Sequence, residues 1–521
     1  MRTRRLARVV VGAVTALGLI VLSPTSTTPA PTPGPGASRT VGPVGAVAGP
    51  GMVPREDRRP PITPLRADPG RPVAPAPDRS ALRERLAELL AHPEVATGGT
   101  VAVSVIDARG RPVFARDAER PLLPASTTKL VTAGAALLAL GPDYRYTTSA
   151  VVSREPDSRG VVHGDLVVLG SGDPALGTPA FGTRVLPQRP RTPLEALADG
   201  IAARGVRVVT GGVVGDPSVF AHQPRPAGWP DRYLTTFEGT PSSGLTVDAG
   251  RAIRDRGDGV LVAERSPDPA ATTAAALRAL LIERGVEVRG GHASRVHDTP
   301  PPVRLAEVRS PPLRELLRYM VQHSDNHLAD GIFRTLGVAA GDPTWTGAAA
   351  AARQALQPVG LDWDEIVLAD GSGLSRDDRL SAAALTTLQR YFSTAMPQEW
   401  ADLLALSGRS GTLRGRWTGT AAEAHVRGKT GTLRDVRSFV GTVSDRDGDV
   451  YHLAVLANDL DAAGTAAARR LVDLLVLVLI EDARDCTRRP PPSPTPPPTP
   501  TPAPPPDPAP GAEPGELVCA R

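Results

Sequence analysis

Leu123-Pro124-Ala125-Ser126-Thr127-Thr128-Lys129 stands at the start of an Ala/Leu-rich helical segment that runs to Gly141. A serine that opens a helix has its hydroxyl beside the positive end of the helix dipole and beside free backbone N–H groups. Lys129 follows three positions later on the same helical face, so its amine can reach the serine oxygen. Lys129 can act as a base only if its pKa falls from about 10.4, which burial and a neighbouring cation both favour.

Lysine is scarce in this chain, and both copies lie in short polar motifs. Of the 59 basic residues only Lys129 and Lys429 are lysine, and the other 57 are arginine. A lysine that persists in such a composition is a candidate for a task that arginine cannot perform, such as losing its proton. The alternative is that two lysines survived drift without any special task.

A second motif, Ser324-Asp325-Asn326, places a hydroxyl and a carboxamide two positions apart on an expected loop. Both side chains can point into one cleft. We expect Ser324 to relay a proton between Lys129 and the leaving group. We expect Asn326, one of only two asparagines, to hold Lys129 and a substrate amide by hydrogen bonds.

The third motif is Lys429-Thr430-Gly431-Thr432, on an expected strand. Strand alternation sends Lys429 and Gly431 to one face, while twist near a sheet edge brings Lys429 and Thr430 toward the same cleft. Gly431 is expected to let the substrate backbone approach closely. The N–H groups of Thr432 and Ser126 are expected to form an oxyanion hole, in which one donor is worth about 3–4 kcal/mol.

Taken together, the three motifs resemble those of the penicillin-recognising serine D,D-peptidases. The chain is most similar to the class C low-molecular-mass penicillin-binding proteins, the DacB-like D-alanyl-D-alanine carboxypeptidase/endopeptidase group. Three further segments carry the resemblance: Leu169-Gly170-Ser171-Gly172-Asp173-Pro174, Asp370-Gly371-Ser372-Gly373-Leu374-Ser375, and Ser410-Gly411-Thr412-Leu413. The long interval between the first two motifs also matches, because family members carry a large insertion there.

The resemblance implies a nucleophile with its general base, a second catalytic pair, and two residues that bind the terminal carboxylate of the substrate: Ser126 with Lys129, Ser324 with Asn326, and Lys429 with Thr430. Asp325 stands where the group often has asparagine, at a position that usually points away from the chemistry. The fold class that follows is α/β (α+β): a β-lactamase/transpeptidase-like antiparallel sheet flanked by helices, with a large inserted domain.

The expected organisation follows from this resemblance and from composition. A transpeptidase-like domain is expected over 79–145 and 306–485, with an inserted domain over 146–305. Helices are expected over 80–91, Ser126–Gly141, 193–204, 268–285, 312–336, 380–393 and 463–481. Strands are expected over Thr100–Ile106, Arg111–Arg116, Val161–Leu169, Val206–Val214, Val260–Ala263, 424–430, 436–444 and 450–457.

Both ends of the chain read as export and spacer segments. Residues 1–22 join an arginine-rich start to the apolar run Val9–Leu22, which is typical of a secretory signal peptide, with an uncleaved membrane anchor as the alternative. Residues 23–78 and 486–521 are proline-rich and cannot pack a core. In an oxidising compartment Cys486 and Cys519 can close the second tract as a loop, and two free or intermolecular thiols are the alternative.

Composition argues against several classes of partner and cofactor. A net charge of +4 and an aromatic content of 3% argue against nucleic-acid binding. His323 and His327 have metal-ligand spacing, but no acidic or third His ligand lies at motif spacing, so we interpret them as helix-surface or packing histidines and expect no metal or cofactor. We interpret Asp370–Ser375 as a structural loop behind the site and Asp377-Asp378-Arg379 as a solvated turn.

The sequence therefore predicts an extracytoplasmic serine-type D-Ala-D-Ala carboxypeptidase/endopeptidase that acts on peptidoglycan stem peptides. β-Lactam antibiotics are expected to acylate the same serine as covalent inhibitors. The first alternative is a β-lactamase or related serine esterase, which needs a water-activating carboxylate that the sequence does not offer at recognisable spacing. The second is a non-catalytic wall-binding or scaffolding protein built on a peptidase fold.

Overall fold

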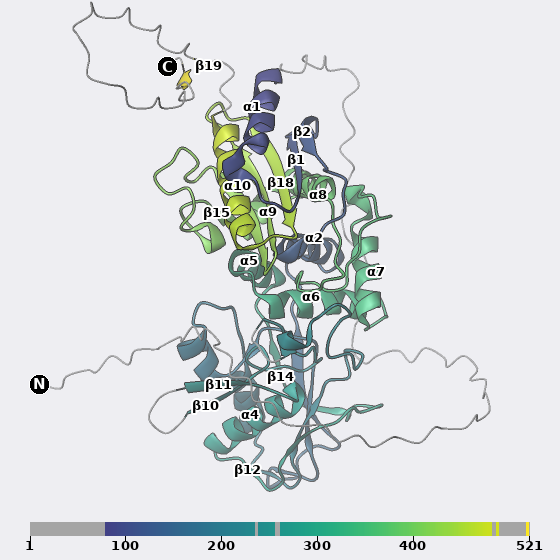
Figure 1. Ribbon diagram of the computed structural model, residues 1–521. Coiled ribbons are helices and arrows are strands. Elements are labelled where there is room, and N and C mark those ends of the chain that lie inside the picture. The colour runs from purple at the N-terminus through teal and green to yellow at the C-terminus, as the bar shows by residue number, and fades with distance from the viewer. Residues whose placement is uncertain (1–78, 235–237, 256–260, 482–485, 489–516, 520–521) are drawn as a thin grey trace, which may run out of the picture. The chain divides into compact units, whose positions relative to one another are not determined.

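The computed structural model describes residues 79–234, 238–255, 261–481, 486–488 and 517–519 (Figure 1). The expected signal peptide and most of both proline-rich tracts lie outside these residues. Among the described helices, none combines the length and apolarity that a membrane crossing needs. The backbone of β19 (Cys486–Arg488) pairs antiparallel with β20 (Leu517–Cys519), which sets Cys486 opposite Cys519.

A six-stranded antiparallel sheet forms the centre of one part of the described chain, and its strand order is β15-β16-β17-β18-β1-β2. The strands are β15 (Ala405–Leu406), β16 (Val426–Leu433), β17 (Val436–Ser444), β18 (Val450–Asn458), β1 (Thr100–Asp107) and β2 (Pro112–Arg116). Strand β1 comes from the N-terminal part of the chain yet lies beside β18, with Thr100 opposite Asn458. The sheet therefore joins both ends of the described chain.

Helices cover both faces of this sheet, because side chains that alternate along β1 and β18 enter two different cores. Val103 and Val455 pack with helices α1 (Ser80–Ala91) and α10 (Ala462–Ile480). Ala102 and Leu456 face the opposite side. The helices of that side are α2 (Thr128–Ala139), α5 (Leu313–His323), α6 (Asn326–Ala339), α7 (Trp345–Ala355), α8 (Ala382–Ala395) and α9 (Pro397–Leu403). Figure 1 shows α1 and α10 together on one side of β18.

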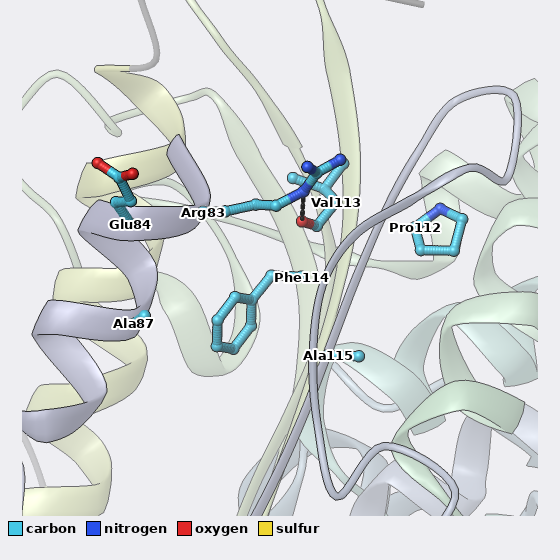
Figure 2. Close-up of a pocket in the computed structure, with 7 residues that line it drawn as sticks. All are labelled: Arg83, Glu84, Ala87, Pro112, Val113, Phe114 and Ala115. Atoms are coloured by element: carbon cyan, nitrogen blue, oxygen red, sulfur yellow. Dashed lines mark hydrogen bonds between the residues drawn. The ribbon is translucent and has the colours of Figure 1, made fainter. Parts of the chain in front are cut away.

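Helix α1 also covers the outer edge strand of the sheet. Arg83 Nε donates to the Val113 carbonyl at 3.1 Å, so the helix satisfies one backbone acceptor of β2 (Figure 2). A shallow hollow of about 560 Å³ lies between the two elements. Because β2 and β16 lie toward opposite edges of the sheet, this hollow is far along the sheet from the Lys429 motif.

Residues between β2 and α5 build further sheets. A five-stranded sheet has the order β13-β9-β5-β3-β14, a three-stranded parallel sheet the order β12-β8-β4, and two pairs join β6 to β7 and β10 to β11. The bounds of this region are β3 (Thr147–Val152), β4 (Val161–Val162), β5 (Leu166–Leu169), β6 (Leu176–Gly177), β7 (Thr192–Pro193), α3 (Leu194–Ala203), β8 (Val208–Val209), β9 (Val213–Asp216), β10 (Arg251–Asp255), β11 (Leu261–Arg265), α4 (Pro269–Glu283), β12 (Glu287–Val288), β13 (His292–Ser294) and β14 (Val303–Arg309).

Most expected elements are present, with three informative differences. The apolar runs Val161–Leu169 and Val206–Val214 each divide into two short strands. The helical segment over 312–336 also divides, because Ser324 adopts a left-handed φ of 59° and ends α5. Asp325 then caps α6 by accepting from the Leu328 N–H at 2.9 Å. The predicted antiparallel sheet flanked by helices is confirmed.

Candidate active site

Ser126 lies in a tight 3-10 turn, Ala125–Thr127, that leads directly into α2. Ala125 is fully buried and has a positive φ of 48°, a conformation that costs a non-glycine residue about 1–2 kcal/mol. Such strain persists where the surroundings over-determine a backbone position. The turn holds Ser126 half-buried and places its Oγ 3.0 Å from Lys129 Nζ, as the spacing predicted.

Lys129 is fully buried and has three oxygen neighbours. Its Nζ lies 2.7 Å from Asn326 Oδ1 and 2.6 Å from the Ser372 carbonyl, in addition to the contact with Ser126. Burial lowers the pKa of Lys129 to about 8, although nearby aspartates, Asp330 first among them, act in the opposite direction. Lys129 is therefore close to the protonation balance that a general base needs at neutral pH.

The Ser324 motif lies where α5 gives way to α6. Ser324 Oγ accepts a hydrogen bond from Lys429 Nζ at 3.0 Å, so its partner is the second lysine rather than Lys129. Asn326 holds Lys129 as expected, but its Nδ2 donates to the Glu238 carbonyl at 2.8 Å. The Asn326 carboxamide, which was expected to bind the substrate amide, thus already has a backbone oxygen of the chain as its hydrogen-bond partner.

Asp325 pairs with Arg189, whose Nε lies 2.8 Å from Asp325 Oδ2. Burial alone would raise the pKa of Asp325, but the Arg189 charge and the capping N–H of Leu328 hold it well below its usual range. Arg189 is almost wholly buried and comes from the interval between the first two motifs. No motif in the sequence singled it out.

Lys429 is fully buried on β16, and its Nζ also donates to the Thr430 carbonyl at 2.6 Å. Burial, together with the charge of Lys129, moves the pKa of Lys429 well below its ordinary value. Strand β15 pairs only with Arg427 and Gly428. Among the described strands, the outer edge of β16 beyond Gly428 therefore has no ladder partner, and Thr430 and Thr432 remain accessible there.

The structure explains why position 431 is a glycine, and the explanation differs from the expected approach of the substrate backbone. A Cβ at this position would lie 2.0 Å from Ser438 Oγ and 3.0 Å from the Ser126 backbone nitrogen. The space beside its Cα is therefore filled by the chain itself, since β16 passes directly against the turn that carries Ser126. This close approach brings the third motif beside Ser126.

A model of the D-Ala-D-Ala carboxypeptidase 3 (S13) family matches residues 82–256 and 252–477. The chain belongs to this family. The match spans all three motifs and both sides of the interval between them, and it confirms the resemblance drawn from Ser126, Ser324 and Lys429.

Individual S13 relatives and solved structures agree with this assignment. The chain is 33% identical over 440 residues to Carboxypeptidase DacB of Mycolicibacterium smegmatis, which covers 80% of this chain and 88% of the relative. It is 30% identical over 463 residues to the D-alanyl-D-alanine carboxypeptidase of an Actinomadura species, covering 75% and 83%. Penicillin binding protein 4 of Haemophilus influenzae has the same fold, with a TM-score of 0.65 at 21% identity over 75% of this chain and 99% of that one. A second structure of that protein holds a β-lactam and matches with a TM-score of 0.60.

The loop Asp370–Ser375 of this S13 chain lies behind the site, as expected. It also contacts the site directly, because the Ser372 carbonyl accepts a hydrogen bond from Lys129 Nζ. A backbone oxygen carries no residue-type signal, so sequence reasoning missed this contact. The prediction of a solvated turn at Asp377-Asp378-Arg379 was wrong at its centre. Asp378 is fully buried, and its Oδ1 accepts from the Ala369 N–H at 2.7 Å.

The two histidines beside the Ser324 motif have different surroundings. His323 is exposed and stacks on Tyr319, with ring centroids 4.1 Å apart. His327 is half-buried and lines a small enclosed space with Asp173 and Asp330. Within the described part of the chain, no cluster of three or more His, Cys, Asp or Glu residues is arranged to hold a metal ion.

Proposed function

We propose that this chain is a penicillin-binding serine D-alanyl-D-alanine carboxypeptidase that acts on peptidoglycan stem peptides through an acyl-enzyme at Ser126. The observation that carries the proposal is the set of neighbours around Lys129 Nζ. Asn326 Oδ1 and the Ser372 carbonyl can only accept hydrogen bonds, whereas the Ser126 hydroxyl can donate one. A neutral Lys129 amine therefore gives its two N–H groups to the carbonyls and directs its lone pair at Ser126.

The reaction follows from this arrangement. Lys129 takes the hydroxyl proton as Ser126 Oγ forms a bond to the carbonyl carbon of the D-Ala-D-Ala peptide bond. The C–N bond then breaks, and the proton passes to the departing D-alanine amine. Ser324 accepts a hydrogen bond from Lys429 and offers a second path for that proton. Water hydrolyses the ester and regenerates Ser126.

We assign recognition of the terminal carboxylate of the substrate to Lys429 and Thr430. Lys429 is buried beside a second lysine, and both circumstances lower its pKa. An incoming carboxylate supplies the opposite charge and favours the protonated amine, so substrate binding is coupled to proton uptake at Lys429. The unpaired outer edge of β16 offers backbone groups to an extended peptide.

The oxyanion of the tetrahedral intermediate is assigned to the backbone N–H groups of Ser126 and Thr432. Gly431 brings β16 against the Ser126 turn, which supports this assignment. One donor lies in the turn that leads into α2 and the other on β16, so both are pre-organised and cost no rearrangement during the reaction.

Release of D-alanine from a stem pentapeptide tests the proposed activity directly. Steady release by the wild-type chain, together with loss of release in Lys129→Arg, is the expected result, because arginine keeps its proton. A folded wild-type chain that releases no D-alanine would contradict the proposal and favour a wall-binding role. Conversion of a cross-linked stem-peptide dimer to its two separate peptides measures the endopeptidase activity that we also propose.

The alternative hypothesis, that the chain is a β-lactamase, predicts rapid turnover of nitrocefin rather than a long-lived acyl-enzyme. Fast deacylation needs a carboxylate that activates water near the ester. The sequence offers no such carboxylate at recognisable spacing. We therefore expect one equivalent of nitrocefin to be opened quickly and further turnover to be slow.

We propose further that the enzyme works outside the cytoplasm, with residues 1–22 as a signal peptide and 23–78 and 486–521 as spacers. We also propose a transpeptidase-like domain over 79–145 and 306–485 with an inserted domain over 146–305. N-terminal sequencing of the exported protein checks the first point, since an uncleaved anchor leaves Met1 in place. A membrane tether is the alternative to a freely secreted enzyme.

A further inference from the structure

The carboxylate of Asp370 accepts four N–H donors, and one of them comes from a distant part of the chain. Its Oδ1 accepts from the backbone of Ser372 at 2.9 Å and of Gly373 at 2.6 Å. Its Oδ2 accepts from the Ser375 backbone at 2.7 Å and from the indole Nε1 of Trp229 at 2.7 Å. Asp370 thus folds its own loop around itself and ties it to a residue 141 positions earlier.

This loop is also fastened to the helix that carries the proposed base. The Ser372 carbonyl accepts from Lys129 Nζ at 2.6 Å, and the Gly371 carbonyl accepts from Thr132 Oγ1 at 2.7 Å. Two successive carbonyls therefore contact one face of α2. The position of the Ser372 carbonyl depends on the loop, and the loop depends on Asp370.

The segment around Trp229 grips the same loop at further points. The Ala227 carbonyl accepts from Ser375 Oγ at 2.8 Å, and the Gly228 carbonyl accepts from the Arg376 N–H at 3.1 Å. Trp229 itself is only 6% exposed, so its indole N–H has left water to bond with Asp370. Three consecutive residues of the interval between the motifs thus hold the loop behind Lys129.

We propose that Trp229 is a positioning residue for catalysis: through Asp370 it sets the Ser372 carbonyl that aims the lone pair of Lys129 at Ser126. The inference rests on the proposed acyl-transfer function. Without the indole donor, the Asp370 carboxylate has one hydrogen-bond partner fewer, and the loop relaxes. The Ser372 carbonyl then leaves Lys129, whose amine no longer points at the Ser126 hydroxyl.

The test compares Trp229→Phe with Trp417→Phe. Trp417 is a similarly buried tryptophan at 7% exposure, and its indole donates to the Asp473 carbonyl of α10 at 3.2 Å, in the core on the other face of the central sheet. For D-alanine release from a stem pentapeptide, Trp229→Phe is expected to lower kcat about tenfold, equivalent to about 1.4 kcal/mol of barrier. KM is expected to stay within about twofold, and Trp417→Phe to leave both constants unchanged.

A double-mutant cycle with Asp370→Asn completes the test. If Trp229 acts through Asp370, Trp229→Phe lowers kcat in the wild-type background but has no further effect in Asp370→Asn. The inference would be overturned if the losses of kcat in the two single variants multiply in the double variant. An unchanged kcat in Trp229→Phe, or a rise in KM alone, would also overturn it. Should Trp229→Phe not fold, Ser375→Ala replaces it, with a loss of kcat supporting the inference and an unchanged kcat overturning it. Failure of the wild-type chain to release D-alanine would instead defeat the proposed function.

Discussion

Lys129 is the residue on which the proposed reaction most depends. It is buried, it contacts Ser126, and its two remaining neighbours are carbonyl oxygens that cannot donate. The contrast with arginine explains why a chain of 57 arginines keeps lysine here. At this scale the sequence was most informative, because the residue types themselves state the chemistry.

The pH dependence of acylation follows from the lowered pKa of Lys129. At a pH below its pKa of about 8, the Lys129 amine carries a proton and cannot accept one from Ser126. The acylation rate is therefore expected to rise about tenfold per pH unit toward pH 8 and to level off above it. Stopped-flow measurement with a chromogenic β-lactam gives this profile, and a rate that is flat from pH 5 to pH 9 would contradict the assignment of Lys129 as the base.

The same pKa makes a prediction for stability. The folded-state pKa of Lys129 is about 8, whereas the ordinary value is 10.5, so the unfolded chain binds more protons between these two pH values. The free energy of unfolding contributed by Lys129 is therefore expected to increase with pH across that window. Denaturant titrations at pH 8 and pH 10 measure it, with Lys129→Met as the variant that lacks this increase.

At the scale of elements, the site depends on close backbone contacts. Gly373 has a φ of 82°, and a Cβ there would lie 1.8 Å from the Ala125 carbonyl oxygen. The loop behind Lys129 thus touches the turn that carries Ser126. Since Ala125 already adopts a strained conformation, this contact helps to hold the turn in place.

Gly373→Ala is expected to damage both stability and activity. The substitution introduces a left-handed alanine and a clash with backbone atoms, which together cost about 2–5 kcal/mol. Gly360→Ala is the matched control, because Gly360 has a φ of 75° with no atom within 4 Å of its Cβ position, and it should cost only about 1–2 kcal/mol. Urea unfolding and acylation rates report the two effects, and equal losses in both variants would refute the role of the contact.

The elements themselves were only partly predictable. The helices expected over 380–393 and 463–481 are present as α8 and α10, and the strands expected over 436–444 and 450–457 are present as β17 and β18. The break between α5 and α6 was missed because it depends on a left-handed Ser324, a residue without glycine's conformational freedom. Asp378 was misread because a run of charged residues resembles a solvated turn, although tertiary contacts bury it.

At the scale of the whole molecule, the interval between the motifs supplies groups that act directly behind the site. Arg189 pairs with Asp325, the Glu238 carbonyl holds Asn326, and Trp229 holds Asp370. None of these contacts was predictable, since each unites residues far apart in sequence and one uses a backbone oxygen. The order of the three motifs predicted the site, but its supporting contacts required the folded chain.

The Arg189–Asp325 pair is expected to be a strong link between these parts. Breaking a buried ion pair leaves one charge without a partner, so Arg189→Met and Asp325→Asn should each cost about 3–5 kcal/mol. The double variant should lose less than the sum of the two. The exposed pair between Arg204 and Glu155, 3.2 Å apart, is the control and should show coupling below about 1 kcal/mol. Additive losses at Arg189 and Asp325 would contradict the predicted coupling.

The most direct test of the account is covalent labelling of the nucleophile. The wild-type chain and Ser126→Ala are incubated with a fluorescent penicillin, and the labelled peptide is identified by mass spectrometry. We predict one stoichiometric label on Ser126 in the wild-type chain and none in Ser126→Ala, with both proteins folded. Equal labelling of the two proteins, or a label on another residue, would contradict it.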